Sequence, residues 1–514
     1  MIRLDLIAPL AELLRRQSAD HPDKIAFEDK TRSITYRDLA NEVNTLASNL
    51  IARGLPPGGS VGIWLPNSVD WVVATLAAIR AGGVAVPIAF DAKQAEMDYR
   101  VEDAGIRIIV SRIEKREAIA TSGKIDPSAV ILTDDADSEN GFKSLCPRTA
   151  SEIALKDDDI DDVSMIVYTS GTTGSPKGVM LTTRSMLWVN AACWAPIFGM
   201  GPDDTILSPL PLFHSYALNF CVLSIVANGA TEYVMERFST HEAMDLLGSG
   251  RFTKMPGVPT MFHYLMLAAK EAGTNPFSSV SRCVSAGAIM PAALNNAFEE
   301  RFGVELLDGY GITETSTMVT MNWPGQARIA GSCGLPLPGL AVRIIDPATG
   351  KDVPQGDEGE LVVRGPNVMK GYHNKPNETA SALKNGWYHT GDLARADANS
   401  FLTITGRLKE LIIRGGQNIS PAEVEETIVV MDGVRDCAVV GVSHDTLGEV
   451  PVAFIVAEET APDIDSIKAF CSERLSSYKI PHDLVIIETI PRTGSGKIIR
   501  FQLREHYENA GQGR

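Results

Sequence analysis

A glycine-rich segment that directly follows an apolar run constrains the fold of this chain most. Residues 168–179 read Tyr-Thr-Ser-Gly-Thr-Thr-Gly-Ser-Pro-Lys-Gly-Val, and the strand-like run 165–168 leads into them. Glycine lets a backbone turn tightly and approach a ligand closely, and turned backbone N–H groups form a nest for anionic oxygens. Lys177 adds a point charge suited to phosphate. The segment therefore predicts a loop that binds a polyphosphate.

The spacing differs from that of the common nucleotide P-loop. That motif places Gly-Lys-Ser/Thr after a glycine and four further residues, whereas Lys177 here follows Pro176. The alternative is a flexible Gly/Ser linker. A linker needs neither a strand before it nor a lysine within it, so the phosphate-binding interpretation is favoured.

Length and net charge limit the classes of protein to which this chain can belong. A chain of 514 residues is too long for one core, and roughly two to four domains are expected. The net charge of −17 argues against non-specific nucleic-acid binding, which needs a basic face. A bound anion must then be held by local positive groups. One such cluster comprises Arg492, Lys497, Arg500 and Arg504, although a solvated helix face is the alternative.

Cysteine usage and hydropathy indicate a cytoplasmic protein. The seven cysteines are scattered, without a CxxC pair or metal-ligand spacing, which is typical of thiols in a reducing compartment. The N-terminus carries charges and Pro9, unlike a secretory signal. The apolar stretch 71–90 is interrupted by Arg80, two glycines and Pro87, so we expect no transmembrane segment.

The pattern of apolar residues predicts α/β organisation. Helical spacing over 36–50, a strand at 60–65, a helix at 71–81 and a strand at 84–87 predict a parallel sheet. Residues 166–325 repeat this alternation, after an acidic stretch at 134–162 that we expect to form a surface loop.

The last third of the chain changes character. Glycines and prolines separate short alternating strands over 326–405, which predicts a small β-rich unit. From residue 408 onward an α+β domain is expected, with helices at 421–430 and 464–476 and strands at 438–442 and 452–456.

Five further segments join the glycine-rich one in a recognisable order. They are Leu-Pro-Leu-Phe-His-Ser-Tyr-Ala-Leu at 210–218, Asp-Gly-Tyr-Gly-Ile-Thr-Glu-Thr at 308–315, Tyr-His-Thr-Gly-Asp-Leu at 388–393, Gly-Arg-Leu-Lys-Glu-Leu-Ile-Ile-Arg-Gly-Gly at 406–416, and Pro-Arg-Thr-Gly-Ser-Gly-Lys-Ile-Ile-Arg at 491–500. Together the six segments resemble the signature of the adenylate-forming superfamily, which comprises acyl-CoA synthetases, luciferases and the adenylation domains of peptide synthetases.

The resemblance implies a fold and a domain organisation. It predicts a large N-terminal domain, residues 1–406, built of α/β subdomains plus a small β-barrel-like unit at 326–405, which binds the acid and ATP. A small mobile α+β domain, residues 407–514, would follow and rotate about a hinge at Lys409 between two half-reactions. Such gating often limits turnover.

The resemblance also implies an activity. A thiol cannot displace oxide from a carboxylate, so the acid first attacks the α-phosphate of ATP, pyrophosphate leaves, and the acyl adenylate then carries AMP as a good leaving group. The implied function is an ATP-dependent carboxylic acid–CoA ligase that uses ATP, Mg²⁺ and coenzyme A. The charge developing at the α-phosphorus must be stabilised.

Site residues are carried over from the matching segments. The pyrophosphate portion of ATP would be bound by Thr169, Ser170, Gly171, Thr172, Thr173, Gly174 and Lys177. Adenine and ribose would be bound by Gly287, Ala288, Asp308, Gly309, Tyr310, Gly311, Asp392 and Arg407. Lys409, Gly415 and Gly416 would serve the hinge and the thiol channel, where glycine permits close approach of a pantetheine arm. Ile289 departs from the pattern, since many relatives carry proline there.

Four residues are candidates for catalysis: Lys497, Thr313, Glu314 and His214. Lys497 would bridge the substrate carboxylate and the α-phosphate; otherwise it is a solvated surface charge. Glu314 would bind Mg²⁺, which takes hard oxygen ligands; otherwise it is an acid at a helix start. Thr313 would donate to the α-phosphate.

The acyl pocket is expected to form from eight residues: His214, Ser215, Tyr216, Phe220, Val258, Ser285, Gly309 and Gly311. Amino-acid-activating relatives usually have an aspartate where His214 stands. No acidic residue occurs between Leu210 and Asn228, so an α-amino acid is disfavoured. Pocket linings are mostly apolar, and we expect a largely apolar fatty or aromatic acid. His214 would gate the pocket; its alternative is a core imidazole.

Three alternatives stay open at this point. A stand-alone adenylating enzyme would load the acyl group onto an acyl-carrier protein in trans, because no carrier attachment site follows residue 500. A non-catalytic nucleotide-binding homologue is the second alternative, against which Lys177, Glu314, Asp392 and Lys497 argue. A luciferase-type oxidation is the third.

Overall fold

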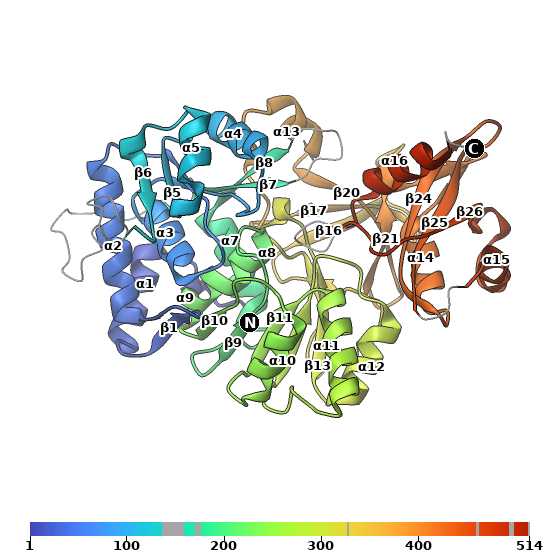
Figure 1. Ribbon diagram of the computed structural model, residues 1–514, viewed down its shortest axis with the longest axis horizontal. Coiled ribbons are helices and arrows are strands. Elements are labelled where there is room, and N and C mark those ends of the chain that lie inside the picture. Colours follow the sequence, from blue (N-terminus) through green and yellow to red (C-terminus); the bar gives the residue numbers. More distant parts are fainter. Residues whose placement is uncertain (136–158, 170–175, 326–327, 459–461, 493–497, 512–514) are drawn as a thin grey trace.

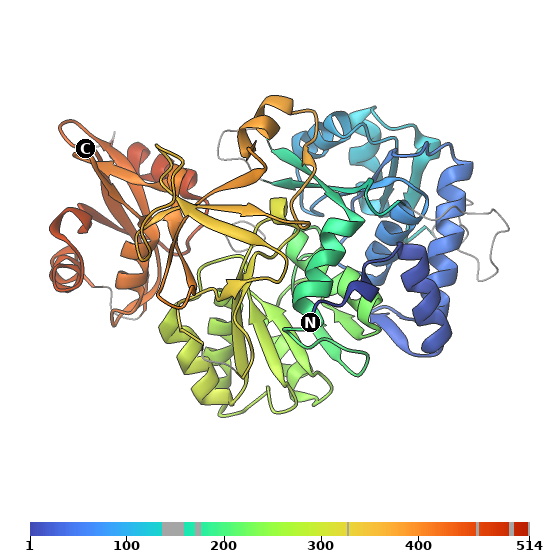
Figure 2. The same ribbon diagram turned by 180° about the vertical axis from the view of Figure 1, so that it is seen from behind.

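The structure is a computed structural model, and it describes residues 1–135, 159–169, 176–325, 328–458, 462–492 and 498–511. Within these ranges the strands form four sheets. Figure 1 shows two unequal parts: the elements up to β21 (Leu402–Arg407) form the large part, and those from β22 (Ile412–Arg414) form the small part at one end. Figure 2 shows the same division from behind.

The first sheet is mostly parallel. Its order is β18-β8-β7-β4-β3-β5-β6; β8 and β18 run antiparallel to their neighbours and the other pairs are parallel. Its strands are β3 (Ser60–Ile63), β4 (Val84–Pro87), β5 (Ile108–Ser111), β6 (Val130–Leu132), β7 (Val163–Thr169), β8 (Lys177–Thr182) and β18 (Gly371–Tyr372). Its helices are α2 (Tyr36–Ala52), α3 (Val69–Arg80), α4 (Gln94–Asp103) and α5 (Arg116–Ser122), with the 3-10 turns η2 (Ile113–Lys115) and η3 (Pro127–Ala129).

The second sheet has the order β15-β14-β13-β12-β11-β9-β10-β1-β2, and its central strands from β13 to β1 are parallel. The strands are β1 (Ile25–Glu28), β2 (Ser33–Thr35), β9 (Thr205–Ser208), β10 (Thr231–Val234), β11 (Lys254–Gly257), β12 (Arg282–Ser285), β13 (Glu305–Tyr310), β14 (Thr320–Met321) and β15 (Leu335–Pro336). Its helices are η1 (Leu4–Leu6), α1 (Leu10–Asp20), α7 (Thr183–Val189), α8 (Ser215–Ala217), α9 (Ser224–Asn228), α10 (Thr240–Gly248), α11 (Pro259–Ala272), α12 (Ala292–Phe302), η6 (Thr313–Thr315) and the π-helices η4 (Asn190–Trp194) and η5 (Leu218–Leu223).

The two remaining sheets are largely antiparallel. The third joins β16 (Ala341–Ile345), β17 (Gly359–Arg364), β19 (Leu383–Lys384), β20 (Trp387–Ala396) and β21, with helix α13 (Pro376–Ala382). After η7 (Leu408–Glu410), the fourth joins β22, β23 (Gln417–Ile419), β24 (Val434–His444), β25 (Gly448–Ala457) and β26 (Asp483–Ile486), with α14 (Pro421–Val429), α15 (Ile464–Ser472), η8 (Ser477–Lys479) and α16 (Arg500–Gly511).

The predicted alternation, the β-rich unit and the α+β domain are confirmed, with one shorter helix. We expected a helix over 464–476, but α15 ends at Ser472. The Leu475 N–H still closes a last turn on the Cys471 carbonyl, at 2.7 Å, and the backbone of Ser476 is extended. Most of the acidic stretch 134–162, which we expected to form a surface loop, lies outside the described residues.

Local signals explain where the helices around the site begin and end. The Thr35 hydroxyl accepts the Asp38 N–H at 3.1 Å at the start of α2, and Ser68 caps α3. Such caps stabilise a helix by roughly 1 kcal/mol each. Helix α11 starts with Pro259 in its first turn and ends at Gly273, whose φ of +64° favours glycine.

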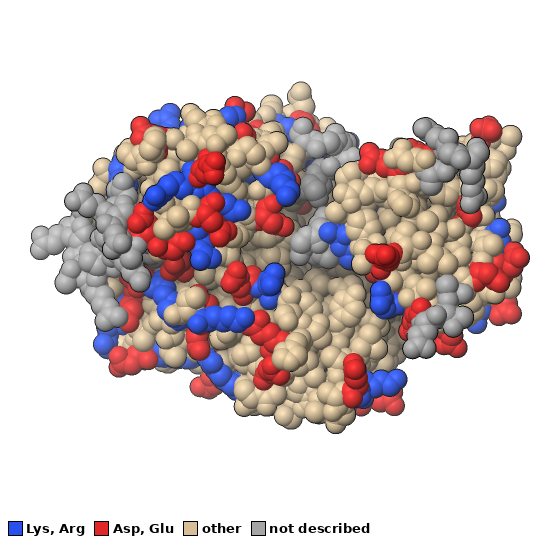
Figure 3. Space-filling view, in the orientation of Figure 1, with Lys and Arg blue, Asp and Glu red and all other residues tan. Residues whose placement is uncertain are grey.

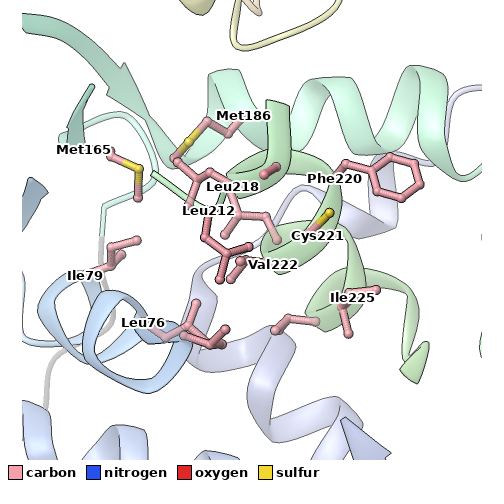
Figure 4. Close-up of a cluster of buried hydrophobic side chains, with 14 of the residues drawn as sticks. Leu76, Ile79, Met165, Met186, Leu212, Leu218, Phe220, Cys221, Val222 and Ile225 are labelled. Atoms are coloured by element: carbon pink, nitrogen blue, oxygen red, sulfur yellow. The ribbon is translucent and has the colours of Figure 1, made fainter. Parts of the chain in front are cut away.

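A single apolar core connects the first two sheets. Figure 4 shows Leu76 and Ile79 from α3, Met165 from β7 and Phe220 and Val222 from η5 in the same cluster. All of these side chains are buried. Burying each such side chain contributes roughly 1.5–3 kcal/mol. The shared core fixes the two sheets relative to each other, and with them the ends of β7, β12 and β13.

Charges of both signs cover the surface. Figure 3 shows basic and acidic side chains interspersed over the large part, so the net charge of −17 does not gather in one acidic patch on this face. The six cysteines within the described ranges are buried free thiols. None of the described helices combines the length and the apolarity that a membrane span requires.

Candidate active site

The predicted site residues lie where parallel strands end. Residues 285–288 span the end of β12, residues 308–311 span the end of β13, and Thr169 closes β7. Ligands of open parallel sheets bind at the carboxyl ends of the strands. The segments that carry Ser215, Thr313 and Glu314 lie near this edge, as the contacts below show.

Lys177, Tyr372 and Glu314 lie next to one another on the phosphate side. Lys177 opens β8 and pairs with Thr169 across the hairpin, and its Nζ lies 4.9 Å from the centre of the Tyr372 ring. The Tyr372 hydroxyl donates to Glu314 Oε1 at 2.9 Å. Strand β18 places Tyr372 there because it pairs with β8. The predicted phosphate residues Ser170, Gly171, Thr172, Thr173 and Gly174 lie outside the described residues.

Two tyrosines surround the Glu314 carboxylate. Burial, and next the charge of Glu314, raise the pKa of Tyr372 and the pKa of Tyr388. The Met369 N–H holds the Glu314 carbonyl at 2.8 Å. The described residues contain no group of three or more His, Cys, Asp or Glu side chains that could hold a metal. A single carboxylate fits Mg²⁺ nonetheless, because protein sites bind it through one or two carboxylates plus substrate phosphates.

Thr313 and Ser215 connect the Glu314 segment to the predicted acyl segment. The Thr313 and Ser215 hydroxyls lie 3.0 Å apart, and the Thr317 hydroxyl donates to the Ser215 carbonyl at 2.8 Å. Gly311 is required between them: a Cβ there would lie 1.6 Å from the Thr317 carbonyl oxygen. Two segments about a hundred positions apart in the sequence thus meet at one point.

Asp392 lies between Tyr310 and Arg407. The Tyr310 hydroxyl donates to Asp392 Oδ2 at 2.5 Å, and Arg407 Nε lies 2.7 Å from Oδ1. The antiparallel register of β20 and β21 sets Asp392 opposite Arg407. The Asp392 charge raises the pKa of Arg407, and burial, followed by the same charge, raises the pKa of Tyr310. Each carboxylate oxygen keeps a second lone pair for a ligand hydroxyl.

A bulge in β20 helps to aim Asp392. The register against β17 shifts between Glu360 and Val362, and bulges commonly redirect side chains beside active sites. The buried Glu360 carboxylate stabilises the bulge, since one oxygen accepts the Gly391 N–H at 3.1 Å and the other lies 2.9 Å from His389 Nδ1. The Asp392 N–H donates to the Thr390 hydroxyl at 3.0 Å.

Asp308 faces a polar cavity of about 280 Å³ at the end of β13. Its Oδ1, like Asn322 Oδ1 beside it, is buried and has no hydrogen-bond partner in the described part of the chain. Burial raises the pKa of Asp308 well above its usual value. Gly287 has a φ of +89°, a conformation that favours glycine, and Ala288 follows it.

The acyl-pocket candidates surround η5 and the ends of β11 and β12. The Tyr216 hydroxyl donates to the Val284 carbonyl at 3.3 Å, and the fully buried Phe220 ring packs 4.8 Å from Trp194. The His214 ring lies 4.2 Å from Phe213, just before α8. Ser285 ends β12 and Val258 directly follows β11, and both residues are buried. A Cβ on Gly309 would lie 2.3 Å from Met318 Cε.

Asn219 fixes the π-helical region beside this pocket. Its amide donates to the Ser316 carbonyl at 3.3 Å and to the Met186 carbonyl at 2.9 Å, and its oxygen accepts Trp194 Nε1 at 2.8 Å. π-Helical turns occur frequently at functional sites. Here Asn219 of η5 connects Trp194 of η4 to Ser316, two residues after Glu314.

Two family models match the chain. The model of AMP-binding enzymes matches residues 14–373, and the model of the AMP-binding enzyme C-terminal domain matches residues 423–497. The chain belongs to the AMP-binding enzyme family.

Several relatives and solved structures are acid–CoA ligases or synthases by name. A feruloyl-CoA synthase of an Amycolatopsis species is 33% identical over 96% of this chain and 98% of that protein. A sulfoacetate–CoA ligase of Cupriavidus necator is 34% identical, covering 97% of each. An anthranilate CoA ligase bound to anthranoyl-AMP has a TM-score of 0.90 at 26% identity, over 100% of both chains. This family member is therefore an acid–CoA ligase that uses ATP and works through an acyl adenylate.

The structure as a whole is more similar to an ATP-bound relative than to the same relative without ATP. ATP-bound MatB from Rhodopseudomonas palustris matches with a TM-score of 0.88, and apo MatB with 0.78. Both matches have 31% identity and cover 97% of this chain and 99% of the other. At equal identity and coverage, the whole-chain geometry of this protein is thus more similar to the ATP-bound structure than to the apo structure.

Three of the candidates in the C-terminal part of this AMP-binding enzyme lie on η7 and on the β22–β23 turn. Lys409 lies in η7, and Gly415 and Gly416 form the exposed β22–β23 turn with φ of +56° and +83°. Lys497 lies outside the described residues. Its flanking residues are described: Arg492 and Ile498 form an antiparallel bridge.

Two of the arginines in the cluster predicted from the sequence, Arg492 and Arg500, form ion pairs and do not belong to a solvated positive face. Arg492 Nη2 lies 2.8 Å from Asp436 Oδ1. Arg500 is largely buried, with its Nε 2.9 Å from Glu410 Oε2 and its Nη1 paired with Glu425. Carboxylates therefore neutralise both arginines. Arg504 is half-exposed, 4.0 Å from Glu449.

The sequence analysis missed Tyr372. No local pattern marks this residue, because its contacts with Lys177 and Glu314 arise from the pairing of β18 with β8, nearly two hundred residues apart. Tyr99 and Asp103 of α4, which contact both ends of the glycine-rich segment, were missed for the same reason.

Proposed function

We propose that this acid–CoA ligase activates a largely apolar aromatic or fatty acid, with Mg²⁺ as the metal ion. One observation carries the proposal. A continuous chain of contacts runs from Lys177 through Tyr372 to Glu314, and Thr313, next to Glu314, contacts Ser215 of the acyl segment. A polyphosphate at one end and a carboxylic acid at the other would meet at Thr313.

Each part of the nucleotide has candidate partners. Asp392 would accept the ribose hydroxyls through its remaining lone pairs, with Arg407 and Tyr310 fixing its orientation. Burial raises the pKa of Asp308 well above its usual value, which favours the neutral carboxyl group. A neutral carboxyl group offers one donor and one acceptor, which match N1 and the amino group of adenine.

The triphosphate requires positive charge, which the local residues supply against a net charge of −17. We assign Lys177 to the departing pyrophosphate and Glu314 to Mg²⁺. Bound Mg²⁺ would neutralise charge on the phosphate oxygens. Thr313 would donate to the α-phosphate from its position beside Ser215. By the family resemblance, Lys497 would stabilise the charge that develops as the carboxylate attacks.

The lining of the acyl segment favours an apolar acid. Trp194, Tyr216 and Phe220 form an aromatic cluster with ring centroids 4.8–6.2 Å apart. The segment 210–228 contains no charged residue, so a second anionic group on the acid would have no ion-pair partner in this segment. The named substrates of the feruloyl-CoA synthase and the anthranilate ligase are aromatic acids, which supports an aromatic acid for this chain.

Thiol transfer would follow a rotation of the small domain about Lys409, which would bring Gly415 and Gly416 toward the pantetheine channel. The exposed backbone and positive φ of these two glycines fit a close approach by an extended ligand. We assign the domain boundary to the stretch between β21 and β22 that contains η7.

A panel of acids tests the proposal. The protein would be incubated with ATP, Mg²⁺ and hydroxylamine, together with ferulate, benzoate, anthranilate, octanoate, malonate or sulfoacetate, and hydroxamate and pyrophosphate would be measured. We expect product with an aromatic or fatty acid and little with malonate or sulfoacetate. A preference for either dianion would contradict the assignment of an apolar pocket.

The role of Lys497 has a matched test in the same assay. Lys497→Ala should lose adenylation by about 100-fold or more, as expected for the loss of a charge that stabilises a transition state. The same variant should still form the thioester from synthetic acyl-AMP and coenzyme A. Full adenylation by this variant would remove Lys497 from the proposal.

A further inference from the structure

The chain after Glu314 passes through two successive residues with a positive φ. Ser316 has a φ of +51° and Thr317 a φ of +104°, and both residues are buried. The described ranges contain five non-glycine residues with a positive φ, and among them Thr317 is the β-branched one. A β-branched residue in this region of backbone conformation is an outlier. The backbone of Thr317 is therefore strained.

Buried amides from two other segments hold this turn. The Asn219 side chain, from η5, donates to the Ser316 carbonyl at 3.3 Å. The Asn367 side chain, from the stretch between β17 and β18, donates to the Thr315 and Met318 carbonyls at 3.0 and 2.8 Å. Both asparagines are buried. Strained backbone persists where its surroundings fix it in this way.

The turn also closes on the residues that precede it. The Thr317 N–H donates to the Ile312 carbonyl at 3.1 Å, and a Cβ on Gly311 would lie 1.6 Å from the Thr317 carbonyl oxygen. Thr313 and Glu314 lie between these contacts in the sequence. Thr317 is therefore held at a fixed place relative to the candidates for the α-phosphate and for Mg²⁺.

The side chain of Thr317 contacts the acyl segment. Its hydroxyl donates to the Ser215 carbonyl at 2.8 Å, and the Ser215 hydroxyl lies 3.0 Å from the Thr313 hydroxyl. Glycine would adopt a φ of +104° without strain, whereas threonine destabilises the fold at this position. The hydrogen bond to Ser215 is what threonine offers here and glycine lacks.

We propose that Thr317 is a positioning residue for adenylation. Its hydroxyl, aimed by the strained turn, holds the acyl segment at Ser215 in a fixed position relative to Thr313 and Glu314. A carboxylate bound in that segment would thereby lie within reach of the α-phosphate, and such orientation supplies much of the rate of a reaction between two bound groups. The proposal rests on the proposed function, since it requires that Ser215 belongs to the acyl pocket and Thr313 to the α-phosphate site.

Three substitutions at this position test the role of the hydroxyl. Thr317→Ala and Thr317→Gly both remove it, so each should lower kcat/KM for the acid about 3- to 10-fold at saturating ATP. Thr317→Ser keeps the hydroxyl and should retain most of the wild-type value. The assay is hydroxamate formation with whichever of ferulate, benzoate, anthranilate, octanoate, malonate and sulfoacetate the wild type converts fastest.

Binding of the nucleotide is the internal reference. Isothermal titration would measure Kd for α,β-methylene-ATP with Mg²⁺ in the wild type and in the three variants. This Kd should stay unchanged, because the amides of Asn219 and Asn367 keep the turn in place without the Thr317 hydroxyl. A loss on the acid side with intact nucleotide binding is what a contact to Ser215 predicts.

Stability separates positioning from general damage. Thr317→Gly and Thr317→Ala differ by one methyl group, and alanine retains the strain at this φ whereas glycine does not. Urea unfolding should therefore give Thr317→Gly the higher midpoint, although both variants are equally slow. Thr231→Ala is the matched control: it removes a buried threonine hydroxyl of β10 that donates to the Ile25 carbonyl at 2.6 Å, and it should leave kcat/KM unchanged.

Equal losses of activity in Thr317→Ala and Thr317→Gly, with activity kept in Thr317→Ser, would support the proposal. An activity that follows the unfolding midpoint, or a weakened binding of the ATP analogue, would assign Thr317 a merely structural role and overturn it. Unchanged kcat/KM in Thr317→Ala would overturn it too and leave the proposed function intact. No product from the wild type with any acid of the panel would contradict the proposed function itself, and the role of Thr317 with it.

Discussion

Glu232 lies on β10 with no exposed surface, and neither of its carboxylate oxygens has a hydrogen-bond partner within the described residues. The Ser208 hydroxyl lies beside it without normal hydrogen-bond geometry. Burial raises the pKa of Glu232 well above its usual value. Burial without a partner costs the charged carboxylate more free energy than the neutral carboxyl group, so it favours the protonated form of Glu232 in the folded protein.

This predicts a stability that falls as pH rises. The unfolded chain releases the Glu232 proton near its usual pKa of 4.5, whereas the folded chain retains it up to the raised pKa. The contribution of this group is therefore complete below pH 4.5 and is lost progressively above it. Glu232→Gln cannot ionise and should gain roughly 1–3 kcal/mol in the free energy of unfolding at pH 8 relative to the wild type.

Urea unfolding at pH 5 and pH 8, followed by tryptophan fluorescence, measures this difference. The advantage of Glu232→Gln should shrink toward pH 5. Glu236→Gln, an exposed neighbour, is the matched control and should show no such trend. An advantage that is equal at both pH values would contradict the ionisation argument.

Glu314 is the residue on which the metal assignment depends. Glu314→Gln keeps an oxygen that can accept from the Tyr372 hydroxyl but removes the negative charge that Mg²⁺ needs. We expect adenylation to fall by about 100-fold or more, with thioester formation from synthetic acyl-AMP retained. The measurement is the rate of each half-reaction against Mg²⁺ concentration; a Mg²⁺ dependence identical to the wild type would remove Glu314 as the ligand.

At the residue scale, the sequence motifs identified some of the candidate site residues and missed others. Glu314, Asp392 and Arg407 lie in segments that carry a recognisable order of residues, and the structure brings Asp392 and Arg407 together. Tyr372 and Tyr99 lie in segments without a pattern of their own. Their importance comes only from pairing and packing across long sequence separations.

Among the elements, α16 and η7 are held together by Arg500. This side chain pairs with Glu410 beside the predicted hinge residue and with Glu425 of α14, and it donates to the Val439 carbonyl at 2.8 Å. Burial opposes the charge, but the two carboxylates raise the pKa of Arg500 overall. Arg500 thus connects the element that follows Lys497 to the start of the small domain.

Arg500→Met should destabilise the small domain, because it leaves two carboxylates without their partner. Breaking a buried ion pair from one side is typically destabilising by roughly 3–5 kcal/mol. Arg504→Met is the control, since Arg504 is half-exposed and its nearest carboxylate oxygen is 4.0 Å away. Limited proteolysis would measure opening of this domain in each variant; equal protection in both would contradict the role of Arg500.

The elements themselves were largely predictable, and their pairings were not. Hydrophobic periodicity located α2, α3, β3 and β4, because each is long enough or apolar enough to carry a pattern. Strand β18 has two residues and no pattern, yet it brings Tyr372 to Lys177. The bulge that aims Asp392 depends on Glu360 from another strand, which no local signal could reveal.

At the scale of the molecule, contacts hold the small part in its present orientation. The Ser420 hydroxyl at the start of α14 donates to the Thr405 carbonyl of β21. His263 of α11 lies near Asp436 and Glu458, and Glu426 lies near Arg395. Within the described residues these contacts are polar, as is common at interfaces between domains that move relative to each other, and this is compatible with the proposed rotation of the small domain.

Restricting the predicted hinge should separate the two half-reactions. Proline fixes φ and removes an N–H donor, so Lys409→Pro should trap one orientation. Because the structure as a whole is more similar to an ATP-bound relative than to the same relative without ATP, adenylation should persist while thioester formation falls about tenfold or more. Single-turnover assays of each half-reaction would measure this effect. Lys409→Ala is the control, because it removes the side chain without restricting φ, and it should retain both steps.

The most direct test of the whole account follows an oxygen atom. The acid from the panel that reacts fastest would be labelled with ¹⁸O in its carboxylate and turned over with ATP, Mg²⁺ and coenzyme A. If the carboxylate attacks the α-phosphorus, mass spectrometry should find one ¹⁸O in AMP and none in pyrophosphate. Label in inorganic phosphate, with ADP as the nucleotide product, would show an acyl phosphate route and contradict the account.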